Sequence, residues 1–371
     1  MTEKIHVVIT GANGFIGKNL CLRLSELEEY IVTPLARGCD HSEFVRVVGN
    51  ADILIHLAGV NRPSDPADFA RNYQDIEVLT AAIDISGNKA LVIYASSTSA
   101  ADESQYGRSK KIAEETLCTF ADKSGCPVAI LRLPNVFGKW CKPNYNSAVA
   151  TFCHNIARNL PISVNDPSSP LSLLYIDDLV DQIIDLVSSA DGGSNFTEIK
   201  NVYQTTVGEV ADLIYKFHSQ RHEAHIENVG VGLCRALYAT YISYLPPESF
   251  SYDLVSHSDP RGSFSEMLRT KEAGQFSYFN AYPGVTRGGH YHHSKTEKFL
   301  VVHGEALFRF RHMLTGEVHS LRTSSHKPTV VDTIPGWSHD ITNVGDDVMV
   351  CLLWANELFD RMRPDTIQAE V

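Results

Sequence analysis

Apolar positions in the first half of the chain form short runs separated by longer stretches with helical spacing. The helical stretches lie at 15–28, 66–85, 106–123, 146–159, 175–189 and 207–219. The apolar runs have the length of buried strands and lie at 5–9, 31–35, 53–57, 90–95 and 127–132. Because strands alternate with helices, the pattern predicts a doubly wound α/β fold with a parallel sheet covered on both faces.

The second half changes to strand-like patterning. Prolines and turn residues gather in 242–263, a composition typical of a linker. Beyond it, β-rich runs separated by Gly, Asp and Pro lie at 275–282, 297–303, 306–312, 329–334 and 347–354. These features predict an α/β domain over 1–245 and an all-β barrel over 246–371.

Composition narrows the functional classes. The 371 residues carry a net charge of −12, which argues against nucleic-acid binding but permits an anionic substrate. Eight cysteines without a C-x-x-C pair are typical of reduced thiols. No apolar run approaches the ~18 residues of a membrane span, and the first strand begins too early for a signal peptide. We therefore expect a cytoplasmic protein without membrane contact.

A glycine-rich turn follows the first strand, with the sequence Thr-Gly-Ala-Asn-Gly-Phe-Ile-Gly over 10–17. Three glycines at this spacing, between a strand and a helix, are typical of a Rossmann turn that holds a dinucleotide pyrophosphate. Asp52 and the stretch 57–59 belong to the next strand and its end, where the cofactor riboses would pass. The predicted contacts are Gly11, Asn13, Gly14, Phe15, Ile16, Gly17, Asp52, Leu57, Ala58 and Gly59.

Arg37 lies just after the second strand, where NAD-specific proteins carry an acid. An arginine at this place favours the 2′-phosphate of NADPH. Asp40 is close enough in sequence to keep NADH as an alternative.

Tyr106 and Lys110 are four residues apart and share one face of a helix. A neighbouring ammonium lowers the pKa of a phenol and prepares it for acid–base chemistry. Upstream, a cluster of hydroxyl residues over 96–99 ends a strand, and one of these hydroxyls can polarise a substrate carbonyl.

Together these motifs resemble the extended short-chain dehydrogenase/reductase family over about 1–245. Further matches are His56-Leu-Ala-Gly59, Arg132-Leu-Pro-Asn135-Val-Phe-Gly138 and Tyr175-Ile-Asp-Asp178. The resemblance implies that Tyr106 is the proton donor, that Lys110 tunes it and that Ser97 binds the carbonyl, with Ser96 and Thr98 as alternatives. It also implies a sugar-nucleotide site at Asn135, Lys139, Lys142, Asn144 and Asn146. The two lysines either meet the pyrophosphate or form a solvated basic loop.

A second motif lies in the β-rich half: Gly284-x5-His290-x-His292-x4-Glu297-x6-Gly304, then Gly336-x2-His339-x3-Asn343. On a strand His290 and His292 share a face, whereas His293 points away. A turn over 294–296 is needed before Glu297 can join them. Three imidazoles and one carboxylate suit Zn²⁺ best, and also Fe, Mn or Ni. The predicted metal ligands are therefore His290, His292, Glu297 and His339.

This motif resembles the cupin barrel over roughly 255–371, although Pro335 stands directly before Gly336, where cupins usually have one residue between. The whole chain resembles the bifunctional capsular-polysaccharide enzymes of the UDP-N-acetyl-L-fucosamine pathway. Segments 140–147, 259–264, 297–302, 356–360 and 363–366 carry this likeness.

The resemblance implies that the cupin epimerises C3 of a UDP-2-acetamido-2,6-dideoxy-4-hexulose. The reductase then reduces the C4 ketone with NADPH to UDP-2-acetamido-2,6-dideoxy-L-talose, for capsule or O-antigen synthesis. The candidate epimerisation bases are His293, Lys295 and His312.

Two alternatives stay open: a reductase or dehydratase with a structural, dimer-forming cupin, and a redox-sensing binding protein. A homodimer through the helices at 66–85 and around Tyr106 is also expected.

Overall fold

The computed structural model describes residues 4–35, 38–189, 196–223, 225–254, 256–259, 262–265, 269–270, 274–357, 362 and 364–371. Arg37, the predicted contact to a 2′-phosphate, lies outside the described residues. The chain divides into two compact units. Unit 1 comprises 1–136 and 171–204, and unit 2 comprises 137–170 and 205–371.

A six-stranded parallel sheet forms the centre of unit 1, with the strand order β2-β1-β3-β4-β5-β8. Its strands are β1 (Ile5–Thr10), β2 (Tyr30–Leu35), β3 (Ile53–His56), β4 (Leu91–Ser97), β5 (Val128–Leu133) and β8 (Phe196–Thr197). The central strands are buried almost throughout, as their apolar runs require. The predicted doubly wound α/β fold is confirmed.

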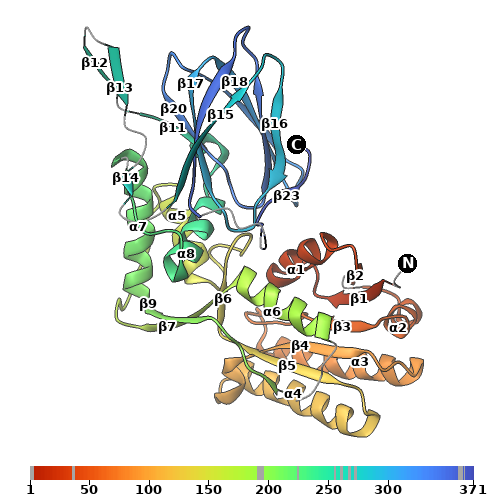
Figure 1. Ribbon diagram of the computed structural model, residues 1–371. Helices are drawn as coiled ribbons and strands as arrows, with labels where there is room; N and C mark the ends of the chain where they lie inside the picture. Colours follow the sequence, from red (N-terminus) through yellow and green to blue (C-terminus); the bar gives the residue numbers. More distant parts are fainter. Residues whose placement is uncertain are drawn as a thin grey trace. The chain divides into compact units, whose positions relative to one another are not determined.

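Helices cover both faces of this sheet. They are α1 (Phe15–Ser25), α2 (His41–Gly49), α3 (Arg71–Ser86), α4 (Gln105–Ser124) and α6 (Ile176–Ser189), with the 3₁₀ turns η1 (Pro66–Ala70) and η2 (Thr98–Ala101). Figure 1 shows α3 and α4 side by side on one face and α1 with α6 on the other. The short helix α2 was not predicted. Asp40 caps it by accepting a hydrogen bond of 3.2 Å from the Ser42 amide, so Asp40 has a structural task there.

Unit 2 contains two five-stranded sheets, with the orders β11-β20-β17-β22-β15 and β19-β18-β21-β16-β23, and neighbouring strands in both sheets pair antiparallel. The first sheet consists of β11 (Ser251–Asp253), β15 (Gln275–Ala281), β17 (Glu297–His303), β20 (Thr329–Asp332) and β22 (Met349–Ala355). The second consists of β16 (Thr286–Tyr291), β18 (Glu305–His312), β19 (Val318–Ser324), β21 (Trp337–Asn343) and β23 (Ile367–Gln368). Aromatic side chains pack between the sheets, for example Phe299 of β17 against Phe308 of β18 at 5.8 Å. The predicted all-β part is confirmed.

Unit 2 also includes helices from the chain before residue 246. These are α5 (Ala148–Ile156), α7 (Val207–Glu223) and α8 (Gly232–Ser243), with the 3₁₀ turn η3 (Pro247–Ser249). Short strands complete the chain: β6 (Asn135–Phe137), β7 (Pro170–Tyr175), β9 (Val202–Thr206), β10 (His225–Ile226), β12 (Ser256–Asp259), β13 (Gly262–Ser265) and β14 (Arg269–Thr270). The compact units therefore follow a different division from the predicted domains, and a domain boundary at 245/246 stays a prediction.

Among the described residues, no helix is both long enough and apolar enough to cross a membrane.

Candidate functional sites

The glycine-rich turn brings β1 and β3 together at the start of α1. Gly11 has φ +72°, and a Cβ there would lie 2.5 Å from the Ala58 backbone nitrogen. A Cβ at Gly17 would lie 2.4 Å from the Gly11 carbonyl oxygen. Both positions therefore require glycine. Gly14 caps α1 without a side chain, which leaves the helix N-terminus suited to a phosphate group.

The predicted cofactor residues separate into two groups. Leu57, Ala58 and Gly59 follow β3 and adjoin the glycine turn, where the Leu57 amide donates to the Thr10 carbonyl at 3.1 Å. Asp52 precedes β3, and its carboxylate accepts a hydrogen bond of 2.7 Å from the His6 amide. The carboxyl ends of parallel strands carry the cofactor crevice. The structure thus places Asp52 at the opposite end of β3 from the glycine turn.

Lys110 is buried beside Gly59, in the loop after β3. Its ammonium donates to the Ala95 carbonyl at 2.9 Å and to the Tyr94 hydroxyl at 3.2 Å. A Cβ at Gly59 would lie 3.3 Å from the Lys110 nitrogen, so Lys110 borders the predicted cofactor crevice. Burial lowers the pKa of Lys110 to about 8, an effect that Glu114 opposes.

Tyr106 lies on the same helix, α4, and interacts with Ser97. Burial raises the pKa of Tyr106, and a hydrogen bond with the Ser97 side chain opposes this rise. The expected direction was a lowering of this pKa by Lys110; instead the pKa is raised, and the Lys110 ammonium contacts Tyr94 and Ala95. The structure thus brings together Tyr106 and Ser97, with Lys110 one helical turn along α4.

The alternatives to Ser97 have other surroundings. The Ser96 hydroxyl is buried and donates to Glu114 at 2.5 Å. Glu114 also forms an ion pair of 2.6 Å with Arg132. Thr98 is exposed and begins η2. Of the three hydroxyls, Ser97 is the one with a hydrogen bond to Tyr106, and its role at the substrate carbonyl stays a prediction.

Asn72 of α3 belongs to this site and was missed from the sequence. Its side chain exchanges two hydrogen bonds with the Val60 backbone, at 2.7 and 2.9 Å, and donates to the Ser109 hydroxyl at 2.9 Å. It therefore ties the loop after β3 to α4. A polar residue on the buried face of a helix was the available signal.

The predicted sugar-nucleotide residues differ in burial. Asn135 is exposed on β6, and Lys142, Asn144 and Asn146 are exposed in the loop before α5. Lys139 is only 1% exposed, with its ammonium 5.5 Å from the Trp140 ring centre. The solvated-loop alternative thus describes Lys142 but not Lys139.

In unit 2 the four predicted metal ligands converge. One ligand atom from each of His290, His292, Glu297 and His339 lies within 4.8 Å of the others. His290 on β16 pairs directly with His339 on β21, next to an irregularity in the strand register. Residues 293–294 form a bend, and Glu297 begins β17. The predicted turn between the second histidine and the glutamate is confirmed.

The protonation states of this cluster fit a divalent cation. Burial, together with His339 and His292, lowers the pKa of His290 to about 3, so this ring is neutral at pH 7. Burial raises the pKa of Glu297, but His292 and Lys295 outweigh it and hold the carboxyl well below its usual range. Burial lowers the pKa of His339, so this ring is also neutral at pH 7, and its Nε2 lies 3.6 Å from the Glu297 carboxylate. Neutral imidazoles beside a carboxylate are the ligand forms that a metal needs.

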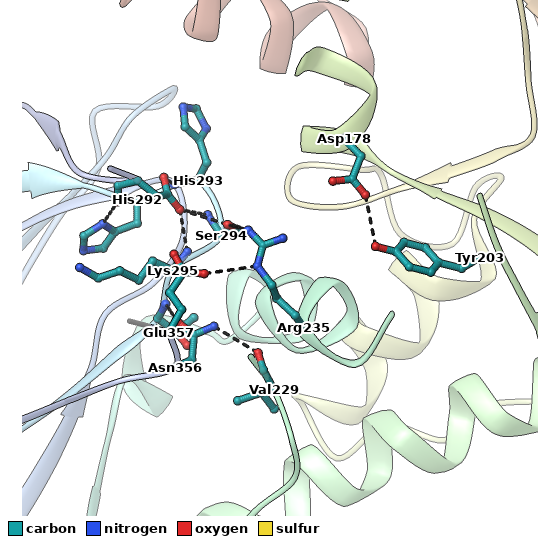
Figure 2. A network of polar contacts seen from close by, with 12 residues as sticks. Asp178, Tyr203, Val229, Arg235, His292, His293, Ser294, Lys295, Asn356 and Glu357 are labelled. Atoms are coloured by element: carbon teal, nitrogen blue, oxygen red, sulfur yellow. Dashed lines mark hydrogen bonds and ion pairs between the residues drawn. The ribbon is translucent and has the colours of Figure 1, made fainter. Parts of the chain in front are cut away.

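Three segments fix the ligand turn 292–297, part of which Figure 2 shows. The Thr296 amide donates to the Asn356 side chain at 2.9 Å, and the Glu297 amide donates to the Thr333 hydroxyl at 2.8 Å. The Gly336 amide donates to the His292 carbonyl at 3.0 Å. Arg235 of α8 donates to the Ser294 hydroxyl (Figure 2). The ligands are thus set on a turn with little freedom.

The unusual Pro335-Gly336 pair has a packing reason. Gly336 has φ +81°, and a Cβ there would lie 2.6 Å from the Trp140 ring. Trp140 in turn lies 6.1 Å from the His312 ring. The turn that departs from the cupin pattern therefore accommodates a tryptophan of the same unit and leaves His339 in register.

A cavity of about 230 Å³ opens on the ligands. It is lined by Phe279, Arg287, Gly288, His290, Glu297, Phe299, Phe308, His339, Asp340, Ile341 and Leu353. Its walls are mostly apolar, with charged groups beside the ligand cluster. None of the candidate bases His293, Lys295 and His312 is among the lining residues.

Unit 1 thus defines a nucleotide-binding α/β enzyme of the dehydrogenase type, and unit 2 contributes a barrel with a candidate metal centre. Residues 7–200 match the NAD dependent epimerase/dehydratase family, and 257–367 match the polysaccharide biosynthesis C-terminal domain. The chain is 50% identical to UDP-2-acetamido-2,6-beta-L-arabino-hexul-4-ose reductase of Pseudomonas aeruginosa, over 98% of each chain. The chain therefore belongs to the NAD dependent epimerase/dehydratase family, in the group that contains this reductase.

Solved structures agree with this assignment. The capsular polysaccharide assembling protein CapF from Staphylococcus aureus matches over 99% of this chain and 100% of its own, with 39% identity and a TM-score of 0.66. UDP-glucuronic acid 4-epimerase from Bacillus cereus, solved with NAD, covers 58% of this chain and 83% of its own, with 19% identity and a TM-score of 0.53. The second likeness concerns the fold alone.

Proposed function

We propose that the chain is a bifunctional nucleotide-sugar enzyme. Its barrel epimerises C3 of a UDP-2-acetamido-2,6-dideoxy-4-hexulose, and its α/β part reduces the C4 ketone with NADPH to UDP-2-acetamido-2,6-dideoxy-L-talose. The product serves the synthesis of N-acetyl-L-fucosamine for capsule or O-antigen. The 50% identity to a hexul-4-ose reductase over 98% of the chain supports the reduction.

Bound NADPH would supply a hydride to C4 of the sugar, and the Tyr106 hydroxyl would donate its proton to the ketone oxygen. Ser97, which contacts Tyr106, donates a hydrogen bond to the same oxygen. Lys110 borders the crevice next to Gly59 and would hold the nicotinamide ribose. The preference for NADPH over NADH rests on Arg37 and stays a proposal.

The epimerisation belongs to the barrel cavity. A volume of about 230 Å³ suits one pyranose ring, and the phenylalanines and Leu353 suit its deoxy and acetyl methyl groups. His290, His292, Glu297 and His339 would hold a divalent metal ion, Zn²⁺ by preference. A bound ion would supply Lewis-acid polarisation of the ketone, which acidifies the C3 proton.

The ionisable lining residues besides the ligands are Arg287 and Asp340, and Asp340 is paired with Arg309 at 2.5 Å. The base is therefore not assigned to a residue, and none of the three candidates gains support from the cavity.

One observation carries the proposal: the Tyr106–Ser97 pair and the four-ligand cluster occur in one chain. A Tyr106→Phe variant should lose at least about 100-fold in NADPH oxidation, because the proton donor is absent. In D₂O it should still exchange the C3 proton of the 4-keto sugar, which NMR of the recovered sugar nucleotide detects.

A matched variant, Tyr215→Phe, removes an exposed phenol of α7 outside both sites and should keep both activities. If Tyr106→Phe shows no deuterium at C3 while wild type incorporates it, one site performs both steps and the bifunctional proposal is wrong.

We also propose a homodimer through α3 and α4. Val78 and Ile85 of α3 are 49% and 66% exposed, and Ile112 of α4 is 43% exposed. Exposed aliphatic side chains on two neighbouring helices are typical of a helical dimer face.

A further inference from the structure

The last residues of the chain run along the strand that carries the first metal-binding histidine. In β23, Gln368 pairs with His290 and Ile367 pairs with Tyr291. The Ala369 amide donates to the Gly289 carbonyl at 2.9 Å. This C-terminal segment, residues 364–371, therefore occupies the edge of β16 that would otherwise be open.

Asp365 precedes β23 and contacts the ligand turn through its backbone. Its carbonyl oxygen accepts a hydrogen bond from Nδ1 of His292. A neutral imidazole that donates from Nδ1 presents Nε2 as an unprotonated acceptor. Nε2 of His292 lies 3.2 Å from the Glu297 carboxylate, inside the ligand cluster. The carbonyl thus selects the tautomer that a metal requires.

The Asp365 carboxylate contacts the same turn from its backbone side. One oxygen accepts from the His293 amide at 2.8 Å. The other accepts from the amides of Ser294 at 2.7 Å and Lys295 at 2.8 Å, and from the Ser294 hydroxyl at 3.1 Å. Three successive amides on one carboxylate form an anion-binding nest. These amides span the turn that lets His292 and Glu297 face the same point.

We propose that Asp365 is a positioning residue of the metal centre. It orients His292 through its carbonyl, and it sets the distance between His292 and Glu297 through its carboxylate. This inference rests on the metal site of the proposed function. It assigns to the C-terminal segment a task beyond completing the sheet.

The competing explanation is that Asp365 only stabilises the barrel. The two explanations predict different effects of a substitution. Loss of a purely structural residue alters the stability of the metal-free and the metal-loaded chain equally. A positioning residue alters the affinity for the ion and the ligand field around it. Loss of a partner that orients a ligand typically costs ~10–100-fold in metal affinity.

The experiment compares full-length wild type, Asp365→Asn and Asp346→Asn, the last being the same change at an exposed position in the same unit. Zn²⁺ affinity is measured by competition with a chromophoric chelator. Co²⁺-loaded protein reports ligand geometry through its visible absorption, and melting temperatures of metal-free protein report folding. A chain ending after Thr366 keeps Asp365 but lacks β23.

We expect Asp365→Asn to weaken Zn²⁺ binding by ~10-fold or more and to change the Co²⁺ spectrum. Asp346→Asn should match wild type, and the chain ending after Thr366 should bind more tightly than Asp365→Asn. If Asp365→Asn does not fold, Asp365→Ser is measured by the same criteria.

Unchanged affinity and spectrum in the Asp365 variant, with or without a lower melting temperature, overturn the inference while the metal site stands. If wild type itself takes up neither ion, the metal site of the proposed function fails and the inference with it.

Discussion

Lys110 combines full burial with a position beside the cofactor crevice, and both affect how the reductase responds to pH. The ammonium contacts the Tyr94 hydroxyl and the Ala95 carbonyl, neither of which is an anion. Burial without a directly paired anion favours the neutral amine and brings the pKa of Lys110 to about 8. The charge that we propose holds the nicotinamide ribose is therefore lost at mildly alkaline pH.

We expect kcat/KM for ketone reduction to fall as pH rises above about 8, because kcat/KM reports the free enzyme and Lys110 loses its proton there. A Lys110→Arg variant keeps its charge, so this decline should disappear even if its rate is lower. The measurement is a pH profile of NADPH oxidation for both proteins. A wild-type rate that climbs through pH 8 would mean that the neutral amine is the active form.

The lowered pKa of Lys110 also affects stability, and here the effect of rising pH is favourable. The folded chain releases the Lys110 proton near pH 8, whereas the unfolded chain keeps it to about pH 10.5. The unfolded state therefore binds more protons between these values. The contribution of Lys110 to the free energy of unfolding rises with pH across this window.

At the scale of single residues, the sequence indicated which side chains could serve a site, but not which neighbours surround them. Tyr106, Ser97 and the four metal ligands were proposed because they belong to sequence motifs with recognisable spacing. Burial of Lys139, the capping role of Asp40 and the nest around Asp365 were not, because each depends on a contact or environment that spacing does not describe. Asp365 lies 73 positions from His292 in the chain.

Among the elements, α7 and the barrel share a buried charge cluster that was not predicted. Asp332 of β20 forms ion pairs with Arg221 of α7 and with Lys298 of β17, the latter at 2.6 Å. All three residues are at most 8% exposed. Arg221 also donates to the Ser249 carbonyl at 2.5 Å. One carboxylate thus balances two buried cations from different elements.

Asp332→Asn should destabilise unit 2 by about 3–5 kcal/mol, because it leaves two buried cations without their anion. All three tryptophans, Trp140, Trp337 and Trp354, belong to unit 2, so their fluorescence during urea unfolding reports this unit. Asp253→Asn is the control, since its ion pair with Lys327 is exposed and should be worth less than about 1 kcal/mol. Equal shifts in both variants would contradict the buried-cluster explanation.

The sequence predicted element types well where periodicity was long and strong. The parallel strands and the helix of Tyr106 agree with their predicted ranges within a few residues. Two helices, α2 and α8, were missed: α2 has only 9 residues, and α8 follows closely spaced glycines that weaken a helical pattern.

At the scale of the whole molecule, the main difference from the prediction is which segments of the chain belong to which compact unit. Residues 205–245 were predicted to belong with the reductase, yet they form part of the compact unit that holds the barrel. Their contacts explain this grouping. Asn356 donates to the Val229 carbonyl at 3.3 Å, and Arg235 pairs with Glu357 at 3.4 Å. Hydrophobic patterning identifies strands and helices but does not report which elements pack together.

A chain ending at residue 245 should therefore fold poorly, although it contains every predicted reductase residue. Removal of the barrel would leave Arg221 without Asp332, Arg235 without Glu357 and the Val229 carbonyl without Asn356. We expect aggregation or a melting temperature well below that of the full chain, measured by circular dichroism. A soluble fragment with full NADPH oxidation would support the predicted domain boundary and the view that the barrel is a separate structural module.

The two units also constrain how this protein can be changed by recombination. The polypeptide passes from one unit to the other after residues 136, 170 and 204. A single crossover point, such as the predicted linker, cannot exchange one complete unit for that of a relative. An engineer who wished to graft the barrel onto another reductase would have to transfer segments 137–170 and 205–245 with it. Gene shuffling between relatives should accordingly yield active chimeras only when residues 137–170, residues 205–245 and the barrel come from the same parent.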